Sequence, residues 1–114
     1  MKNIGIIGGG LIGSSWAAIF SKSGFNVFVY DPYPEVFNGY EERVILFLEE
    51  LCSKVEYIQE SAPEILSVKQ ELFARLDNLS PQNVVIGSSS SAITISKITQ
   101  NLKGQHRCLS LIHI

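Results

Sequence analysis

The first turn of the chain decides its fold: residues 4–13 read IGIIGGGLIG, an apolar run that leads into closely spaced glycines. Gly8, Gly10 and Gly13 fit the spacing G-x-G-x-x-G, and a second apolar run over residues 26–30 ends in Asp31. A strand, a glycine turn, a helix, a strand and an acid in this order form the dinucleotide-binding fingerprint. The sequence therefore predicts a dinucleotide site in this part of the chain.

Each residue of the fingerprint has a physical task. Gly8 can adopt a backbone conformation that side chains disfavour, Gly10 lets a pyrophosphate approach the backbone, and Gly13 permits close helix packing on the sheet. The helix that begins near Gly10 directs free N–H groups and its positive dipole end at the pyrophosphate. Asp31 can accept hydrogen bonds from both hydroxyls of an adenosine ribose. The next two residues offer no cation for a 2′-phosphate, which favours NAD over NADP.

The same stretch has two other interpretations, a secretory signal and a membrane span. No charged residue stands between Lys2 and Lys22, and small residues follow Trp16. A single early Lys, five glycines within the apolar run and a Ser-Ser pair all disfavour a signal peptide. The uncharged stretch is too Gly-rich and too short to favour a membrane span.

Composition indicates one globular domain without a basic surface. The chain has 114 residues, 46% hydrophobic and 18% charged, with a formal net charge of −2. This balance disfavours a nucleic-acid partner, and we expect neither a nucleic acid nor a membrane partner. Cys52 and Cys108 lack metal-binding or redox spacing and lie in apolar periodic segments. We expect buried free thiols, no metal site and a reducing, cytoplasmic location.

Strand-like and helix-like segments alternate along the chain. We expect strands over residues 2–7, 26–31, 55–59, 84–86 and from 106 to 111, and helices over 11–23, about 34–53, 61–76 and 93–102. This alternation predicts a Rossmann-type, doubly wound parallel sheet of the α/β class. Right-handed crossovers then bring every strand-to-helix turn to one edge of the sheet, where a site would form.

The expected third helix has its own start signal and apolar stripe. Ser61 and Glu64 fit the capping box S-x-x-E, with Pro63 in the first turn. The stripe that we expect to face the core consists of Ile65, Val68, Leu72 and Leu76. Gly104 is expected to end the fourth helix.

Four segments together resemble the NAD-binding domain of the 3-hydroxyacyl-CoA dehydrogenase family. They are IGGGLIGSSWA at 7–17, YDP at 30–32, IQESAPE at 58–64 and VVIGSSSS at 84–91. Within the family they resemble most the lambda-crystallin-like branch, which includes L-gulonate 3-dehydrogenase, and carnitine dehydrogenase. The resemblance extends to about Cys108. It implies an NAD-dependent oxidoreductase that oxidises a 3-hydroxy acid or 3-hydroxyacyl-CoA, and it allows a homodimer of the full-length protein.

The resemblance also implies roles for individual residues. Ser91, or alternatively Ser90, matches the serine that binds the substrate hydroxyl near the nicotinamide. The positions implied to contact the cofactor are Gly8, Gly10, Leu11, Ile12, Gly13, Asp31, Glu64 and Lys69.

Several of these positions have explanations that need no ligand. A capping box accounts for Ser61 and Glu64, and an exposed helical lysine accounts for Lys69. The serine run could simply cap the helix that begins near Ala92.

The chain departs from the family pattern after the second strand. Only about half of the family's usual spacing separates Asp31 from Ala62, so we expect one strand of the sheet to be missing. The family's catalytic His-Pro pair would fall near Leu111 or Ile112, and neither is histidine. His113 is not followed by proline, so it is not assigned that role.

We therefore expect a partial domain over residues 1–108. The family's helical C-terminal domain has no counterpart, and residues 109–114 resemble a translated sequencing-library adapter, which predicts a non-native tail. His106 is expected at the surface. Alone, the chain is expected to lack dehydrogenase activity; the alternatives are a stand-alone NAD-binding module and a non-catalytic structural protein.

Overall fold

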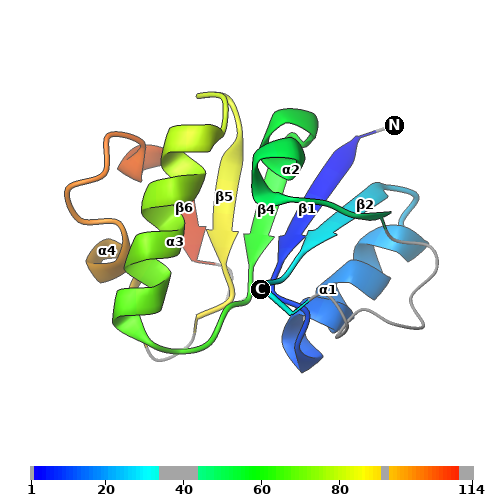
Figure 1. The fold of residues 1–114 in the computed structure, drawn as a ribbon, viewed down its shortest axis with the longest axis horizontal. Helices are drawn as coiled ribbons and strands as arrows, with labels where there is room; N and C mark the ends of the chain where they lie inside the picture. The colour runs from blue at the N-terminus through cyan, green and yellow to red at the C-terminus, as the bar shows by residue number, and fades with distance from the viewer. Residues whose placement is uncertain (1, 34–43, 91–92, 111–114) are drawn as a thin grey trace.

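A computed structural model describes residues 2–33, 44–90 and 93–110. Its elements are β1 Asn3–Ile7, α1 Leu11–Lys22, β2 Asn26–Tyr30, β3 Val44–Ile45, α2 Leu48–Lys54, β4 Tyr57–Glu60, α3 Leu66–Leu79, β5 Val85–Ser88, α4 Ile95–Ile98 and β6 Cys108–Ser110. The six strands form one parallel sheet in the order β3-β2-β1-β4-β5-β6 (Figure 1). The order reverses beside β1, which confirms the doubly wound Rossmann-type fold.

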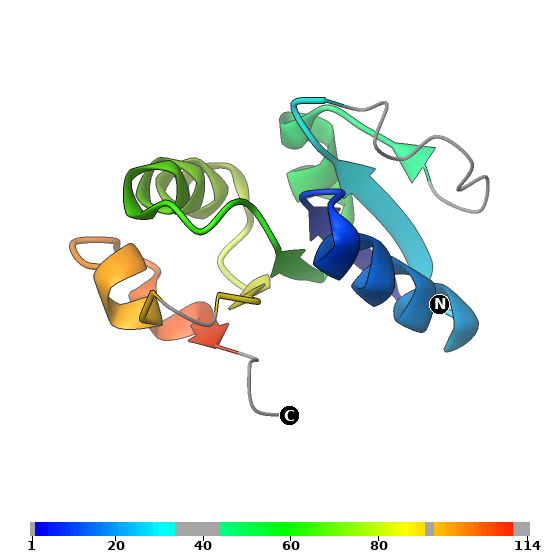
Figure 2. The same cartoon turned by 90° about the horizontal axis from the view of Figure 1, so that it is seen from below.

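The sheet lies between two helical layers. Figure 2 shows α1 on one face of the sheet and α2 and α3 on the other, while α4 lies next to α3 near the β6 edge. Alternate residues of each strand serve the two faces, so each face has its own apolar core. The core under α1 consists of Ile4, Ile6, Ala17, Val27 and Val29, and the larger core under α2 and α3 includes Ile7, Leu51, Ile58, Phe73, Leu76 and Ile86.

The first expected elements are confirmed almost to the residue. The strand expected over 2–7 is β1, the helix expected over 11–23 is α1, and the strand expected over 26–31 is β2. Gly24 has a left-handed φ of 91° directly after α1, as a helix-ending glycine should. Local sequence signals were sufficient here because the elements are contiguous in the sheet.

The expectations for the segment after β2 were wrong in two ways. Residues 34–43 of the helix expected over 34–53 lie outside the described residues, and Val44–Ile45 is a strand, so the described helix begins only at Leu48. The strand expected to be missing is therefore present as β3. It pairs in parallel with Phe28 and Val29. Sheet pairing of two β-branched residues here overrides a helical periodicity.

The third and fourth helices also start and end elsewhere. Helix α3 begins at Leu66, and no side chain caps it, so the capping box formed by Ser61 and Glu64 was wrong. Helix α4 ends at Ile98, before the left-handed residue Asn101, rather than at Gly104. The loop between β4 and α3 is thus longer than predicted, and it carries side chains into the site described below.

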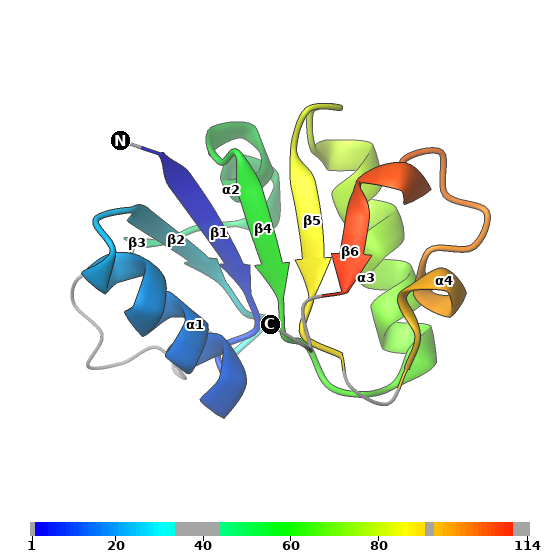
Figure 3. The same cartoon turned by 180° about the vertical axis from the view of Figure 1, so that it is seen from behind.

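The carboxyl ends of the strands meet at one edge, as the topology requires. Figure 3 shows the arrowheads of β1, β4, β5 and β6 pointing to that edge. Cys52 and Cys108 are buried free thiols, as predicted. None of the described helices is long and apolar enough to cross a lipid bilayer. Leu109 and Ser110 belong to β6, residues 111–114 lie outside the described residues, and a non-native tail over 109–114 stays a prediction.

Candidate functional site

The turn after β1 requires glycine at its first position. Gly8 has a φ of 96°, in the left-handed region that side chains disfavour. A Cβ at Gly8 would also lie 2.7 Å from the carbonyl oxygen of Ser61. The N–H of Gly8 donates to the carbonyl oxygen of Tyr30 at 2.9 Å, which ties the turn to the end of β2. Two independent constraints therefore fix this glycine.

The other two glycines of the fingerprint differ in their surroundings. A Cβ at Gly13 would lie 1.8 Å from the carbonyl oxygen of Gly8, so the start of α1 packs against the turn itself. A Cβ at Gly10 would meet no atom within 4 Å. Gly10 therefore leaves an open backbone surface, which is the feature that a pyrophosphate needs for close approach.

The start of α1 is suited to an anion. Gly10 is the N-cap, no side chain caps the helix, and its first turn carries no acidic residue. The first N–H groups of a helix have no partner within the helix, and the dipole adds partial positive charge. The side chains of Leu11 and Ile12 are 87% and 56% exposed at this end, where a bound dinucleotide would cover them.

The carboxylate of Asp31 is already held in place by the backbone. Its Oδ2 accepts a hydrogen bond from the N–H of Gly9, and its Oδ1 accepts one from the N–H of Tyr33, both at 2.8 Å. Each carboxylate oxygen has a further lone pair, so both remain able to accept from ribose hydroxyls. Asp31 thus links β2 to the glycine turn and presents a fixed pair of acceptors.

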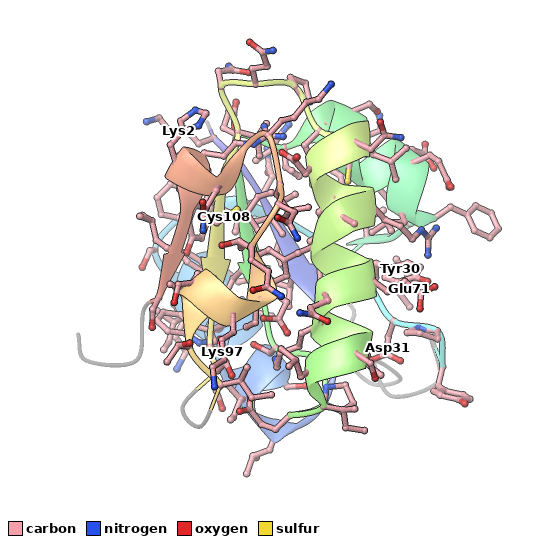
Figure 4. The ribbon with its side chains drawn as sticks, turned by 90° about the vertical axis from the view of Figure 1, so that its left-hand side faces the viewer. Lys2, Tyr30, Asp31, Glu71, Lys97 and Cys108 are labelled. Atoms are coloured by element: carbon pink, nitrogen blue, oxygen red, sulfur yellow. The ribbon has the colours of Figure 1, made fainter. Side chains whose placement is uncertain are left out.

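A cavity of about 730 Å³ opens beside these residues, within the range of roughly 300–1,000 Å³ typical of small-molecule sites. The glycine turn and the end of β2 form one wall, residues 61–63 form a second, and α3 forms the third. In Figure 4, Tyr30 and Glu71 lie side by side next to α3, with Asp31 close by. From α3 the cavity is lined by Val68, Glu71, Leu72 and Arg75.

The apolar stripe predicted for α3 is divided between the cavity and the core: Val68 and Leu72 line the cavity, and Leu76 is buried in the core as predicted. Ile65 is 54% exposed and Val68 is 40% exposed, whereas the buried residues of α3 are Lys69, Phe73 and Leu76. The prediction was therefore right for Leu76 and wrong for Ile65 and Val68. Lys69 occupies the innermost position, and the alternative that treated it as an exposed helical lysine was wrong.

Lys69 belongs to a closed ring of polar contacts at the carboxyl ends of β4 and β5. We call this set the Glu60 ring: Glu60, Glu64, Lys69, Ser88 and Ser90. The Nζ of Lys69 lies 2.5 Å from Oε2 of Glu60 and 3.4 Å from Oε1 of Glu64. The hydroxyl of Ser88 donates to Oε1 of Glu60 at 2.6 Å.

Ser90 closes the ring. Its N–H donates to Oγ of Ser88 at 3.1 Å, and its hydroxyl donates to Oε2 of Glu64 at 2.8 Å. The side chain of Glu64 is 41% exposed, whereas Glu60 and Lys69 are fully buried. Of the two serines proposed for the substrate hydroxyl, Ser90 is thus placed in the site, and Ser91 lies outside the described residues.

A second chain of hydrogen bonds crosses the other face of the same strands. The hydroxyl of Tyr57 donates to Oε1 of Gln59 at 2.5 Å, and Nε2 of Gln59 donates to Oγ of Ser89 at 2.6 Å. The hydroxyls of Ser89 and Ser61 lie 2.9 Å apart. Burial raises the pKa of the Tyr57 phenol above its ordinary value, so it stays protonated and a donor.

Sequence reasoning missed Glu60, Gln59 and Ser89. A signal for Glu60 existed, because it ends a buried strand just as Asp31 follows β2, but acids at strand ends are common. His106 lies exposed in a 3-10 turn, and His113 lies outside the described residues. Within the described part of the chain, no histidine reaches the carboxyl edge of the sheet.

A sequence model described as "3-hydroxyacyl-CoA dehydrogenase, NAD binding domain" matches residues 3–55 and 43–114. Lambda-crystallin of Oryctolagus cuniculus is 33% identical over 132 aligned positions, which cover 91% of this chain and 41% of the relative. An L-carnitine dehydrogenase of Nocardiopsis dassonvillei is 31% identical, over 86% of this chain and 37% of the relative. The chain therefore spans about two fifths of the length of these relatives.

The solved structure of 3-hydroxybutyryl-CoA dehydrogenase from Escherichia coli superposes with a TM-score of 0.88 at 22% identity. The match covers 96% of this chain and 29% of that structure. At this identity the likeness shows the fold. An alignment of 132 positions exceeds the 114 residues of this chain, so lambda-crystallin has residues with no counterpart here.

Proposed function

The chain belongs to the 3-hydroxyacyl-CoA dehydrogenase family as a partial NAD-binding domain, and from this premise we propose how it holds NAD and which reaction it serves. The observation that carries the proposal is the open backbone at Gly10, which lies between the start of α1 and the fixed carboxylate of Asp31. The reaction is oxidation of a 3-hydroxy acid or 3-hydroxyacyl-CoA, with hydride transfer to NAD. The whole protein would perform it.

The adenosine half of NAD would lie on the β1–β2 side of the crevice. Its ribose hydroxyls would donate to Asp31, and its pyrophosphate would sit over Gly10 at the start of α1. Leu11 and Ile12 would be covered by the dinucleotide. The cavity beside α3 would take the adenine ring between its apolar wall residues, among them Val68 and Leu72.

The nicotinamide half would extend across the switch in strand order to the ends of β4 and β5. Glu64 and Lys69 are the two residues that we assign to the cofactor there: Glu64, whose side chain is 41% exposed, would contact it, and Lys69, which is fully buried, would hold Glu64 in place. Bound NAD supplies the hydride acceptor. Ser90, or alternatively Ser91, would orient the substrate hydroxyl by hydrogen bonding; Ser90 follows β5 at the same edge of the sheet, and Ser91 lies outside the described residues.

No general base is assigned among the described residues. A base must reach the hydroxyl that loses its proton, and no described histidine lies at the carboxyl edge. The named relatives also differ from each other, one a lambda-crystallin and one an L-carnitine dehydrogenase. We therefore propose only the class of substrate, which is a small molecule: a 3-hydroxy acid or its CoA ester.

Calorimetric titration of NAD into the purified chain tests the proposal. We expect saturable one-site binding that is weakened at least about tenfold by Asp31→Ala, because charge-assisted hydrogen bonds to the ribose are lost. The control is Glu56→Gln, a carboxylate change at the opposite edge of the sheet, where Glu56 bonds the N–H of Asn3. A folded wild-type chain without saturable NAD binding would show that the proposal is wrong.

A further inference from the structure

Glu60 is the centre of the polar network and has no assigned role. Its side chain is fully buried, so it cannot touch a ligand directly. Resting on the proposed function, we propose that Glu60 is a positioning residue. It fixes the cavity wall of residues 61–63 relative to the serine loop of residues 88–90, and thereby sets the affinity for NAD.

The carboxylate of Glu60 joins several elements of the fold. Oε2 of Glu60 accepts from Lys69 in α3 and, at 2.7 Å, from the N–H of Ala62 in the loop. Oε1 accepts from Ser88 at the end of β5. Glu60 itself ends β4. A single side chain therefore sets the relative positions of β4, its following loop, α3 and β5.

The cavity wall of residues 61–63 is held by hydrogen bonds to both the N–H and the carbonyl oxygen of Ala62. The N–H of Ala62 donates to Glu60, and the carbonyl oxygen of Ala62 accepts from Lys69 at 2.9 Å. Ala62 and its neighbours Ser61 and Pro63 all line the cavity. The carbonyl oxygen of Ser61 also packs against Gly8, where it leaves no room for a Cβ. The position of this wall therefore depends on the Glu60–Lys69 pair.

Glu60 is also connected by hydrogen bonds to the serine loop. Ser88 donates to Glu60 and accepts from the N–H of Ser90, so the loop geometry depends on the Ser88 hydroxyl. The backbone N–H of Ser89 also donates to the carbonyl oxygen of Glu60 at 2.8 Å. Side chain and backbone of one residue thus hold the loop that carries the proposed substrate-binding serine.

The alternative explanation is that Glu60 only neutralises the charge of the buried Lys69. Two variants separate the explanations. Glu60→Asp keeps the charge but shortens the side chain, so it cannot reach all three donors at once. Ser88→Ala keeps every charge and removes only the side-chain link between Glu60 and the serine loop, while the backbone hydrogen bond from Ser89 to Glu60 remains. Charge neutralisation alone predicts wild-type NAD binding for both variants, whereas positioning predicts weaker binding for both.

The experiment is NAD titration of wild type, Glu60→Asp, Glu60→Gln and Ser88→Ala in the full chain, with circular dichroism as a check on folding. We expect losses of affinity of about tenfold for both Glu60 variants and about fivefold for Ser88→Ala, since each hydrogen bond to a charged group is lost or displaced. Ser80→Ala is the control, because Ser80 is buried but lies outside the Glu60 ring. We expect its NAD affinity to stay within about twofold.

A second readout does not depend on ligand. The amide of Ala62 donates to a carboxylate, so its proton should resonate far downfield and exchange slowly in wild type and lose both features in Glu60→Gln. If Ser88→Ala and Glu60→Asp bind NAD as wild type does, the positioning role is wrong. If wild type itself binds no NAD, the proposed function fails and the role of Glu60 with it. If Glu60→Gln does not fold, Ser88→Ala decides.

Discussion

The two sides of the crevice are built from different parts of the chain. On the β1–α1–β2 side, backbone groups and glycines form the site, together with the charged side chain of Asp31. On the β4–α3–β5 side, the side chains of the Glu60 ring form the site and hold the loops that follow β4 and β5. One side depends on the absence of side chains, and the other depends on their mutual contacts.

This difference decides what each side tolerates. The glycine turn fails when an atom is added at Gly8 or Gly13, because the nearest atoms there are backbone atoms that cannot move aside. A buried polar ring fails when an atom is removed, because the remaining partners are left charged or unpaired in a low-dielectric interior. The predictions below test these opposite sensitivities.

The largest effect is expected from Lys69→Met. It leaves Glu60 fully buried without its ammonium partner, and such a loss costs about 3–5 kcal/mol of unfolding free energy. Urea denaturation measures this change. The control is Glu49→Gln, which breaks the exposed Glu49–Arg75 pair and should cost only about 0–1 kcal/mol. Equal effects of the two changes would contradict the assignment of the Glu60 ring as the interior support of this side.

A slightly smaller effect is expected on the backbone-built side from Gly13→Ala. The added Cβ would meet the carbonyl oxygen of Gly8 at 1.8 Å, so the start of α1 must shift. We expect a loss of about 2–3 kcal/mol in denaturation experiments. Gly10→Ala is the matched change in the same turn, where no atom lies within 4 Å. It should leave the unfolding free energy within about 0.5 kcal/mol and weaken NAD binding instead.

The carboxylate of Asp31 is expected to set the choice between NAD and NADP. Its two oxygens are fixed by Gly9 and Tyr33, and a negative charge there repels a 2′-phosphate. Asp31→Asn should therefore narrow the preference for NAD over NADP by about tenfold, which corresponds to about 1.4 kcal/mol. Parallel titrations with the two cofactors measure the ratio. An unchanged ratio would remove Asp31 from the ribose site.

The smallest effect concerns pH and the packing beneath β5 and β6. Burial, with a further contribution from Asp77, raises the pKa of the Cys108 thiol from about 9 to about 11. Above pH 9 the unfolded chain loses this proton while the folded chain keeps it, so stability falls as the pH rises. We expect the free energy of unfolding to fall by about 1 kcal/mol between pH 9 and pH 10 in wild type, and by less in Cys108→Ala. An identical fall in the variant would exclude Cys108 as the cause.

The same contrast explains what could be predicted from the sequence. The fingerprint residues are local, because Gly8, Gly10 and Gly13 act within one turn and Asp31 follows the next strand. The spacing of these residues is by itself typical of a strand, a glycine turn and a helix that bind a dinucleotide. The parallel sheet, with its strand-to-helix turns at one edge, followed from the alternation of elements and the handedness of crossovers. The two-residue strand β3 did not, because its pairing with β2 depends on a partner outside the segment.

The Glu60 ring could not be predicted because its members meet only in the folded sheet. Periodicity placed Ile65 and Val68 in the core, since apolar residues usually mark the buried stripe of a helix. The real stripe is Lys69, Phe73 and Leu76, with a lysine at its first position. Only the acid at the end of β4 explains why a lysine can occupy that position.

The central claim is that both sides of the crevice bind one dinucleotide. The most direct measurement is an NMR titration of the isotope-labelled chain with NAD, following backbone amides. We predict that the amides of residues 8–12 and those of residues 88–90 shift together and saturate at the same NAD concentration. Shifts confined to one side, or saturation at two different concentrations, would contradict the claim.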